Sequence, residues 1–168
     1  MTFAQTETLK AIFKYPTRGL SFRHISRISG LSTPVVSRAV SELENQGMVE
    51  VQPNGRAIFV RGKISEPHFQ LRKRFYNHLS LFPLVEYLSR HYIIKCIVVF
   101  GSYARGEDLE DSDIDLLVVG DSLKDALDLS DFETELGRKI QLFTFAKKIP
   151  KDMEYVKKTG VLIYGEYP

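Results

Sequence analysis

The sequence contains a single cysteine, Cys96, among its 168 residues. One cysteine excludes an intrachain disulfide and a zinc site built from several cysteines. Cys96 lies in the apolar run "IIKCIVVF", where a small buried hydrophobic residue is expected rather than a reactive thiol.

Long hydrophobic runs are also missing. No apolar run approaches the roughly 20 residues that are needed to cross a bilayer, and the first residues, "MTFAQTETLK", have no apolar signal core. We therefore expect a cytoplasmic protein with no membrane partner. A composition of 43% hydrophobic and 26% charged residues is typical of globular proteins, and the length suits one ordinary domain or two small ones.

Aspartate is absent from residues 1–92, which hold 13 lysines and arginines against six glutamates, a formal charge of +7. Residues 93–168 hold 10 basic residues against 15 acidic ones, a formal charge of −5. This asymmetry indicates two units with different partners, an anion for the first and cations for the second.

The first unit has the pattern of three helices followed by a hairpin. Helical spacing of apolar residues appears in "TETLKAIFKYP", in "LSFRHISRISG" and from Thr33 to Gly47. The runs "MVEVQ" and "AIFVR" predict two strands, and the Asn54-Gly55 pair between them is a strong hairpin signal. Over roughly residues 5–62 this pattern resembles the winged helix-turn-helix of bacterial and archaeal regulators, and we assign residues 1–65 to it.

The resemblance implies that the third helix enters the major groove of duplex DNA while the hairpin contacts the backbone beside it. The expected DNA-binding residues are those on the exposed side of that helix, with an arginine at the hairpin tip: Thr33, Ser37, Arg38, Ser41 and Arg56. Winged-helix regulators commonly dimerise, so a homodimer is expected. A module that serves only dimerisation or protein docking is the alternative.

Residues 66–168 predict a second domain. Residues 66–92 are expected to form connecting helices with a break near Pro83. From residue 93 onward, strand and helix patterns alternate, which indicates an α+β core of helices packed on a small mixed sheet.

Two aspartates stand two residues apart at the start of the second apolar run, "DIDLLVV". Side chains alternate along a strand, so Asp113 and Asp115 share one face. Two carboxylates this close cannot both stay ionised cheaply unless a cation lies between them. Because Mg²⁺ prefers oxygen ligands and is commonly held by one or two carboxylates with substrate phosphates, the pair predicts a site for Mg²⁺ or Mn²⁺ that is open to a phosphate ligand.

A Gly-Ser pair follows the first predicted strand of this core. Gly101 lets the backbone approach a ligand closely, and Ser102 offers a hydroxyl beside the free N–H groups of a helix start, which favour anions. Arg105 adds a charge suited to phosphate oxygens. We therefore expect a triphosphate and a metal ion to occupy one cleft.

The stretch "GSYARGEDLEDSDIDLLVV" resembles the nucleotidyltransferase domain related to DNA polymerase beta, in particular its minimal prokaryotic members. The resemblance covers about residues 93–168. It implies transfer of a nucleoside monophosphate from a nucleoside triphosphate to a hydroxyl, with two-metal chemistry. By the same resemblance, Asp113 and Asp115 are catalytic metal ligands, and the nucleotide-binding residues are Gly101, Ser102, Arg105 and Ser112.

The sequence departs from that family at one position. The next core strand normally supplies a third carboxylate, and Gln141 stands there instead. A neutral amide binds a metal weakly and cannot accept a proton; Glu133 or Glu135 could substitute. Three functions stay open: a DNA-tethered transferase acting on a protein or RNA, a nucleotide-sensing regulator without catalysis, and an antitoxin-type regulator of a partner protein. Gln141 favours the second.

Overall fold

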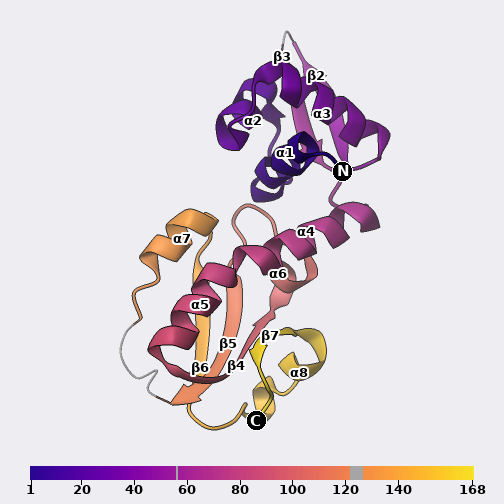
Figure 1. Ribbon diagram of the computed structural model, residues 1–168. Helices are drawn as coiled ribbons and strands as arrows, with labels where there is room; N and C mark the ends of the chain where they lie inside the picture. Colours follow the sequence, from indigo (N-terminus) through magenta and orange to yellow (C-terminus); the bar gives the residue numbers. More distant parts are fainter. Residues whose placement is uncertain (56, 122–126) are drawn as a thin grey trace. The chain divides into compact units, whose positions relative to one another are not determined.

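The computed structural model describes residues 1–55, 57–121 and 127–168. The chain divides into two compact units, Met1–Lys73 and Arg74–Pro168, and the division falls within the long helix α4 (Pro67–Ser80) (Figure 1).

Three helices precede the hairpin in the N-terminal unit as described, and side-chain caps start the first two. Thr2 and Gln5 form a reciprocal capping box at the start of α1 (Phe3–Lys14), and the Ser21 hydroxyl accepts a hydrogen bond from the His24 amide at the start of α2 (Phe22–Ser29). Gly30, in the left-handed conformation, ends α2, and α3 (Thr33–Asn45) follows. Their apolar faces form one core, which includes Leu9, Ile12, Ile25, Val36 and Leu43.

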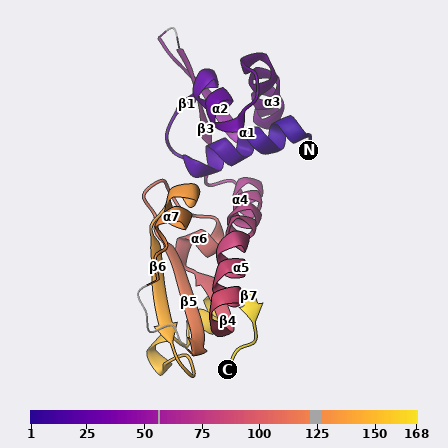
Figure 2. The same ribbon diagram turned by 60° about the vertical axis from the view of Figure 1, so that its left-hand side comes forward.

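A three-stranded antiparallel sheet completes this unit, in the order β1-β3-β2 (Figure 2). The strands are β1 (Leu20–Ser21), β2 (Val49–Asn54) and β3 (Ala57–Gly62). Pairing of β2 with β3 runs from Val49 opposite Gly62 to Asn54 opposite Ala57, which closes the predicted hairpin around Gly55. The winged helix-turn-helix expected from the sequence is therefore confirmed.

The C-terminal unit is built on a mixed four-stranded sheet in the order β6-β5-β4-β7. The pairs β4–β5 and β4–β7 are antiparallel, and β5–β6 is parallel. The α+β prediction is confirmed. The elements after α4 are α5 (Phe82–His91), β4 (Ile93–Phe100), α6 (Gly101–Arg105), β5 (Ile114–Asp121), α7 (Ser130–Leu136), β6 (Ile140–Phe145), η1 (Lys151–Met153), α8 (Val156–Thr159) and β7 (Val161–Gly165).

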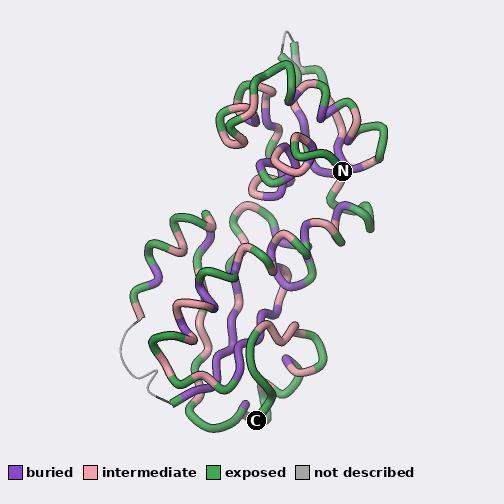
Figure 3. The backbone as a smooth tube through the Cα atoms, viewed as in Figure 1, coloured by how far each residue is buried: buried purple, intermediate pink, exposed green. Residues whose placement is uncertain are grey.

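Each face of this sheet carries its own apolar cluster, so the two central strands are buried along most of their length (Figure 3). One cluster joins α5 and α6 to the face that includes Ile97, Ile114 and Leu116. The other joins the α8 side to the face that includes Cys96 and Leu117, which confirms that Cys96 is buried. Because side chains alternate, Asp113 and Asp115 lie on the same face as Leu117.

None of the helices among the described residues is long and apolar enough to span a membrane.

Candidate functional site

The turn from β4 into α6 brings the backbone against a carboxylate. Gly101 has a φ of 71°, a left-handed conformation that favours glycine. A Cβ atom built on Gly101 would lie 2.2 Å from Oδ2 of Asp115, so any side chain here would displace that carboxylate. The turn predicted to bind phosphate and the strand predicted to bind metal therefore meet directly.

The two predicted metal ligands sit at the same end of β5. Asp113 is exposed just before the strand, and Asp115 is half-buried, opposite Phe100 in the antiparallel pair with β4. Burial, and then the negative charge of Asp113, raise the pKa of the Asp115 carboxyl above its ordinary value. A cation at this position would offset both effects, which is what a metal site requires.

Three further predicted residues surround the turn. Ser102 is half-buried in α6, and Arg105 is exposed at the end of that helix, where its Nε donates a 2.7 Å hydrogen bond to Glu107. The Ser112 hydroxyl accepts a 2.9 Å hydrogen bond from the Leu109 amide. Ser112 thus shapes the loop between α6 and β5 in addition to any contact with a ligand.

Gln141 lies directly beside Asp115. The two residues are partners in the parallel β5–β6 pair, so the third strand aligns as the sequence predicts. One proposed substitute acid, Glu133, is already engaged, because Lys139 Nζ donates to its Oε2 at 2.6 Å and the Ile140 amide donates to its Oε1 at 2.9 Å. These two hydrogen bonds, that of Lys139 first, hold the pKa of Glu133 below its ordinary value.

The chemistry of the available donors fits a single divalent cation. Over the described part of the chain, no group of three or more His, Cys, Asp or Glu residues could hold a metal ion. Two carboxylates with a ligand's phosphate oxygens are a set that Mg²⁺ commonly accepts. Asp113 and Asp115 would therefore hold one ion together with a phosphate group.

A pocket of about 460 Å³ opens on the side of Asp113 toward α7 and β6. Two of the predicted site residues, Ser112 and Asp113, belong to its lining, together with Glu110, Asp111, Ser130, Glu133, Thr134, Gly137, Arg138 and Lys139. The pocket extends from Asp113 along α7 and the turn that leads into β6.

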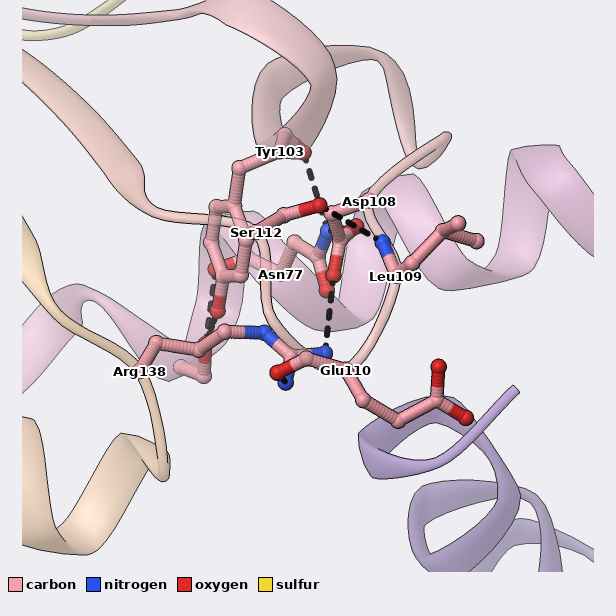
Figure 4. A network of polar contacts seen from close by, with 8 residues as sticks. Asn77, Tyr103, Asp108, Leu109, Glu110, Ser112 and Arg138 are labelled. Atoms are coloured by element: carbon pink, nitrogen blue, oxygen red, sulfur yellow. Dashed lines mark hydrogen bonds and ion pairs between the residues drawn. The ribbon is translucent and has the colours of Figure 1, made fainter. Parts of the chain in front are cut away.

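A buried polar network lies behind the loop, and no sequence motif predicted it (Figure 4). Asn77 Nδ2 donates to the Tyr103 carbonyl at 2.9 Å and to Asp108 Oδ1 at 2.7 Å. Arg138 forms an ion pair with Asp108 at 3.2 Å and donates to the Glu110 carbonyl. These residues come from α4, the loop and the start of β6, so only the fold brings them together.

In the N-terminal unit, α3 presents a polar face opposite its buried one. Thr33, Arg38 and Ser41 are exposed and Ser37 is half-buried, whereas Val36, Ala39, Val40 and Leu43 are buried. The four predicted DNA-binding residues of this helix therefore share its outer side. Arg56, predicted at the hairpin tip, lies outside the described residues.

We expect Gly101→Ala and Gly137→Ala to differ in their effect on the site. Both glycines have left-handed φ values, so each substitution should lower the free energy of unfolding by about 1–2 kcal/mol. Only the new Cβ at residue 101 displaces the Asp115 carboxylate, since a Cβ at Gly137 meets nothing within 4 Å. Urea unfolding should show similar losses for both variants, and an Mg²⁺ titration followed by NMR should be altered in Gly101→Ala alone. Equal Mg²⁺ titrations would contradict the contact.

We expect Asp115→Asn to stabilise the metal-free protein at neutral pH. The raised pKa means that the folded state holds the Asp115 proton more tightly than the unfolded chain. The stability from this group is therefore present below the ordinary value of 3.8 and is lost as pH rises through the raised pKa. In thermal unfolding, the variant should have a higher melting temperature than the wild type at pH 7 and no such advantage at acid pH. Asp121→Asn, at the exposed end of β5, is the control and should show no comparable gain.

Comparison with known proteins agrees with both halves of this description. A family model described as "Polymerase beta, Nucleotidyltransferase" matches residues 83–167, and a MarR family model matches residues 1–57. A relative from Methanocaldococcus jannaschii, provisionally named a protein adenylyltransferase, is 40% identical over 83 residues, covering 41% of this chain and 83% of the relative. A second relative from that organism with the same provisional name is 44% identical over 61 residues, covering 34% of this chain and 71% of the relative.

Two solved structures show weaker likeness. A crystal structure of a toxin-antitoxin with AMP-PNP is 22% identical, covers 54% of this chain and 74% of that chain, and has a TM-score of 0.41. TrmBL2, an archaeal chromatin protein, is 17% identical, covers 86% of this chain and 65% of that chain, and has a TM-score of 0.34. Both scores are low, so the assignment depends on the family models and the curated relatives. The chain belongs to the polymerase beta nucleotidyltransferase family, and its residues 1–57 match the MarR family model.

Proposed function

We propose that the C-terminal unit binds a nucleoside triphosphate with Mg²⁺ or Mn²⁺ and transfers its nucleoside monophosphate to a hydroxyl group, while the N-terminal unit binds duplex DNA. The observation that carries the proposal is the approach of Gly101 to the Asp115 carboxylate. It supports a single site in which one ligand contacts the turn through its phosphates and the carboxylates through a metal ion.

Each residue of the site has a distinct role in this proposal. Gly101 and Ser102 hold the terminal phosphates through backbone N–H groups and a hydroxyl. Asp113 and Asp115 hold the metal ion, which when bound supplies positive charge to the phosphate oxygens. Arg105 exchanges its exposed ion pair with Glu107 for a phosphate contact, at little cost because exposed pairs contribute little.

The acceptor we propose is a protein hydroxyl, and the transferred group is adenylyl. Support comes from the curated relatives, which carry the provisional name protein adenylyltransferase. The pocket between Asp113 and α7 provides space for an acceptor side chain beside the proposed metal ligands. RNA, the other acceptor that the sequence leaves open, is the comparison substrate in a transfer assay.

A second function is favoured by Gln141. This residue stands beside Asp115 where the sequence resemblance implies a third carboxylate, and an amide cannot act as a base. A nucleotide-sensing regulator that binds Mg²⁺-nucleotide without chemistry would need only the turn and the two aspartates. An antitoxin-type regulator of a partner protein could use the same site, either to transfer a nucleotide group or only to bind the nucleotide.

The experiment that tests the proposed site is calorimetry with a non-hydrolysable ATP analogue. We expect binding that requires Mg²⁺ and that is abolished when Asp113→Asn and Asp115→Asn are combined, because the ion then has no charged protein ligand. Asp121→Asn with Asp152→Asn removes the same charge from exposed positions outside the pocket lining and should leave the affinity unchanged. Unchanged affinity in the Asp113/Asp115 double variant would sink the site assignment.

A separate measurement decides between transfer and sensing. We expect the wild-type protein to transfer labelled adenylyl groups slowly or not at all, because general-base help is typically worth about 10²–10⁴-fold. Gln141→Asp should raise the rate by supplying a carboxylate next to Asp115, whereas Gln141→Asn should not. A wild-type rate that falls in the Asp variant would mean that Gln141 does not limit catalysis.

DNA binding by the N-terminal unit is tested with the intact chain in gel shifts. We expect affinity to fall steeply with salt, because lysines and arginines displace counterions from phosphates. In Arg38→Ala, the difference in binding free energy between the preferred DNA sequence and others should fall by roughly 1–3 kcal/mol. Arg90→Ala makes the same charge change on α5 and should bind DNA as the wild type does. A homodimer would select a palindromic site. Absence of any complex at low salt would refute the assignment.

A further inference from the structure

We propose that Asn77, Asp108 and Arg138 are positioning residues that set the nucleotide-binding turn relative to the metal-binding aspartates. The inference rests on the proposed function, because it concerns the geometry of the same site. None of the three belongs to the Gly-Ser or Asp-x-Asp pattern. All three are buried in the C-terminal unit, and their side chains converge behind the loop that joins α6 to β5 (Figure 4).

Asn77 links the two halves of the site through one amide group. Its two N–H bonds reach the Tyr103 carbonyl in α6, next to Ser102, and the Asp108 carboxylate in the loop that leads to Asp113. Neighbouring residues of α4 hold α6 at two more points, since His78 pairs with the Ala104 carbonyl at 3.1 Å and Ser80 with the Tyr103 hydroxyl at 2.8 Å. A shift of α6 relative to the loop would therefore break the Asn77 pair of hydrogen bonds.

Arg138 fixes the loop from the other side. Its guanidinium joins the Asp108 carboxylate and the Glu110 carbonyl, and a planar fork of this kind sets direction as well as distance. The next residue, Lys139, accepts the Ile114 amide at 2.8 Å through its backbone carbonyl. Asp113 thus lies between two points, Glu110 and Ile114, that are both hydrogen-bonded to the two residues just before β6.

Burial indicates that this network serves geometry more than stability. The Asp108 and Arg138 side chains are 1% and 5% exposed. A buried ion pair is weak support for folding, because apolar residues of similar volume often do as well or better. The same pair fixes the loop that leads to Asp113. Loss of a residue that orients a metal ligand typically lowers metal affinity about 10–100-fold.

The test compares Mg²⁺-dependent binding of a non-hydrolysable ATP analogue with thermal stability in the intact chain. The variants are Asn77→Ala, which removes the buried amide group with its two hydrogen bonds, and Arg138→Lys, which keeps the charge but not the fork. Glu86→Gln, which breaks the exposed Arg90–Glu86 pair on α5, is the matched control. We expect affinity to fall about 10–100-fold in Asn77→Ala, less in Arg138→Lys, and not at all in Glu86→Gln.

Hydrogen exchange separates positioning from folding. In both network variants, backbone amides of residues 107–113 should exchange faster at a temperature where β4 and β5 keep wild-type protection. If the variants lower the melting temperature yet bind the analogue as tightly as wild type, the network is only structural and the inference is wrong. If wild-type protein itself fails to bind the analogue with Mg²⁺, the proposed function fails, whereas loss confined to the variants supports the positioning role.

Discussion

The close approach of a backbone to a carboxylate is the constraint on which the C-terminal unit depends. Gly101 and Asp115 can meet only because β4 and β5 pair antiparallel with Phe100 opposite Asp115, so that the end of one strand faces the beginning of the next. That register also places buried residues of both strands in two apolar clusters, among them Val98, Val99, Leu116 and Leu117. A slip by one residue would exchange the faces and destroy core and site together.

Two neighbouring acids carry an electrostatic cost at this point. Burial and Asp113 both raise the pKa of Asp115, so its ionised form is disfavoured, and either protonation or a bound cation would lower that cost. Asp115 lies on a strand that packs between two apolar clusters, which fixes its position, whereas Asp113 is exposed just before that strand. Proteins commonly hold strained or poorly compensated groups at functional sites, where a ligand then relieves them.

The sequence was informative wherever a local pattern determines the structure. Apolar runs predicted the strands of the second sheet, and Asn54-Gly55 predicted the hairpin. Gly101 and Asp115, chosen from their local motifs, lie next to each other. The polar network of Asn77, Asp108 and Arg138 had no such signal, because its members are far apart in the chain and are ordinary residue types in their local contexts. Their meeting depends on how α4, the loop and the segment before β6 pack together, and the spacing of apolar residues in the sequence does not indicate that packing.

Gln141 shows why binding and catalysis have to be separated in this chain. The strand pairing puts its amide beside Asp115, so the absence of a carboxylate there reflects the sequence and not a different alignment of the sheet. The nearby Glu133 is engaged with Lys139 and with the start of β6, which makes it a poor source of a base. In the proposed function, the turn at Gly101 and the aspartate pair would bind the ligand without help from either residue. Binding would then survive although the part of the site that activates an acceptor is weakened.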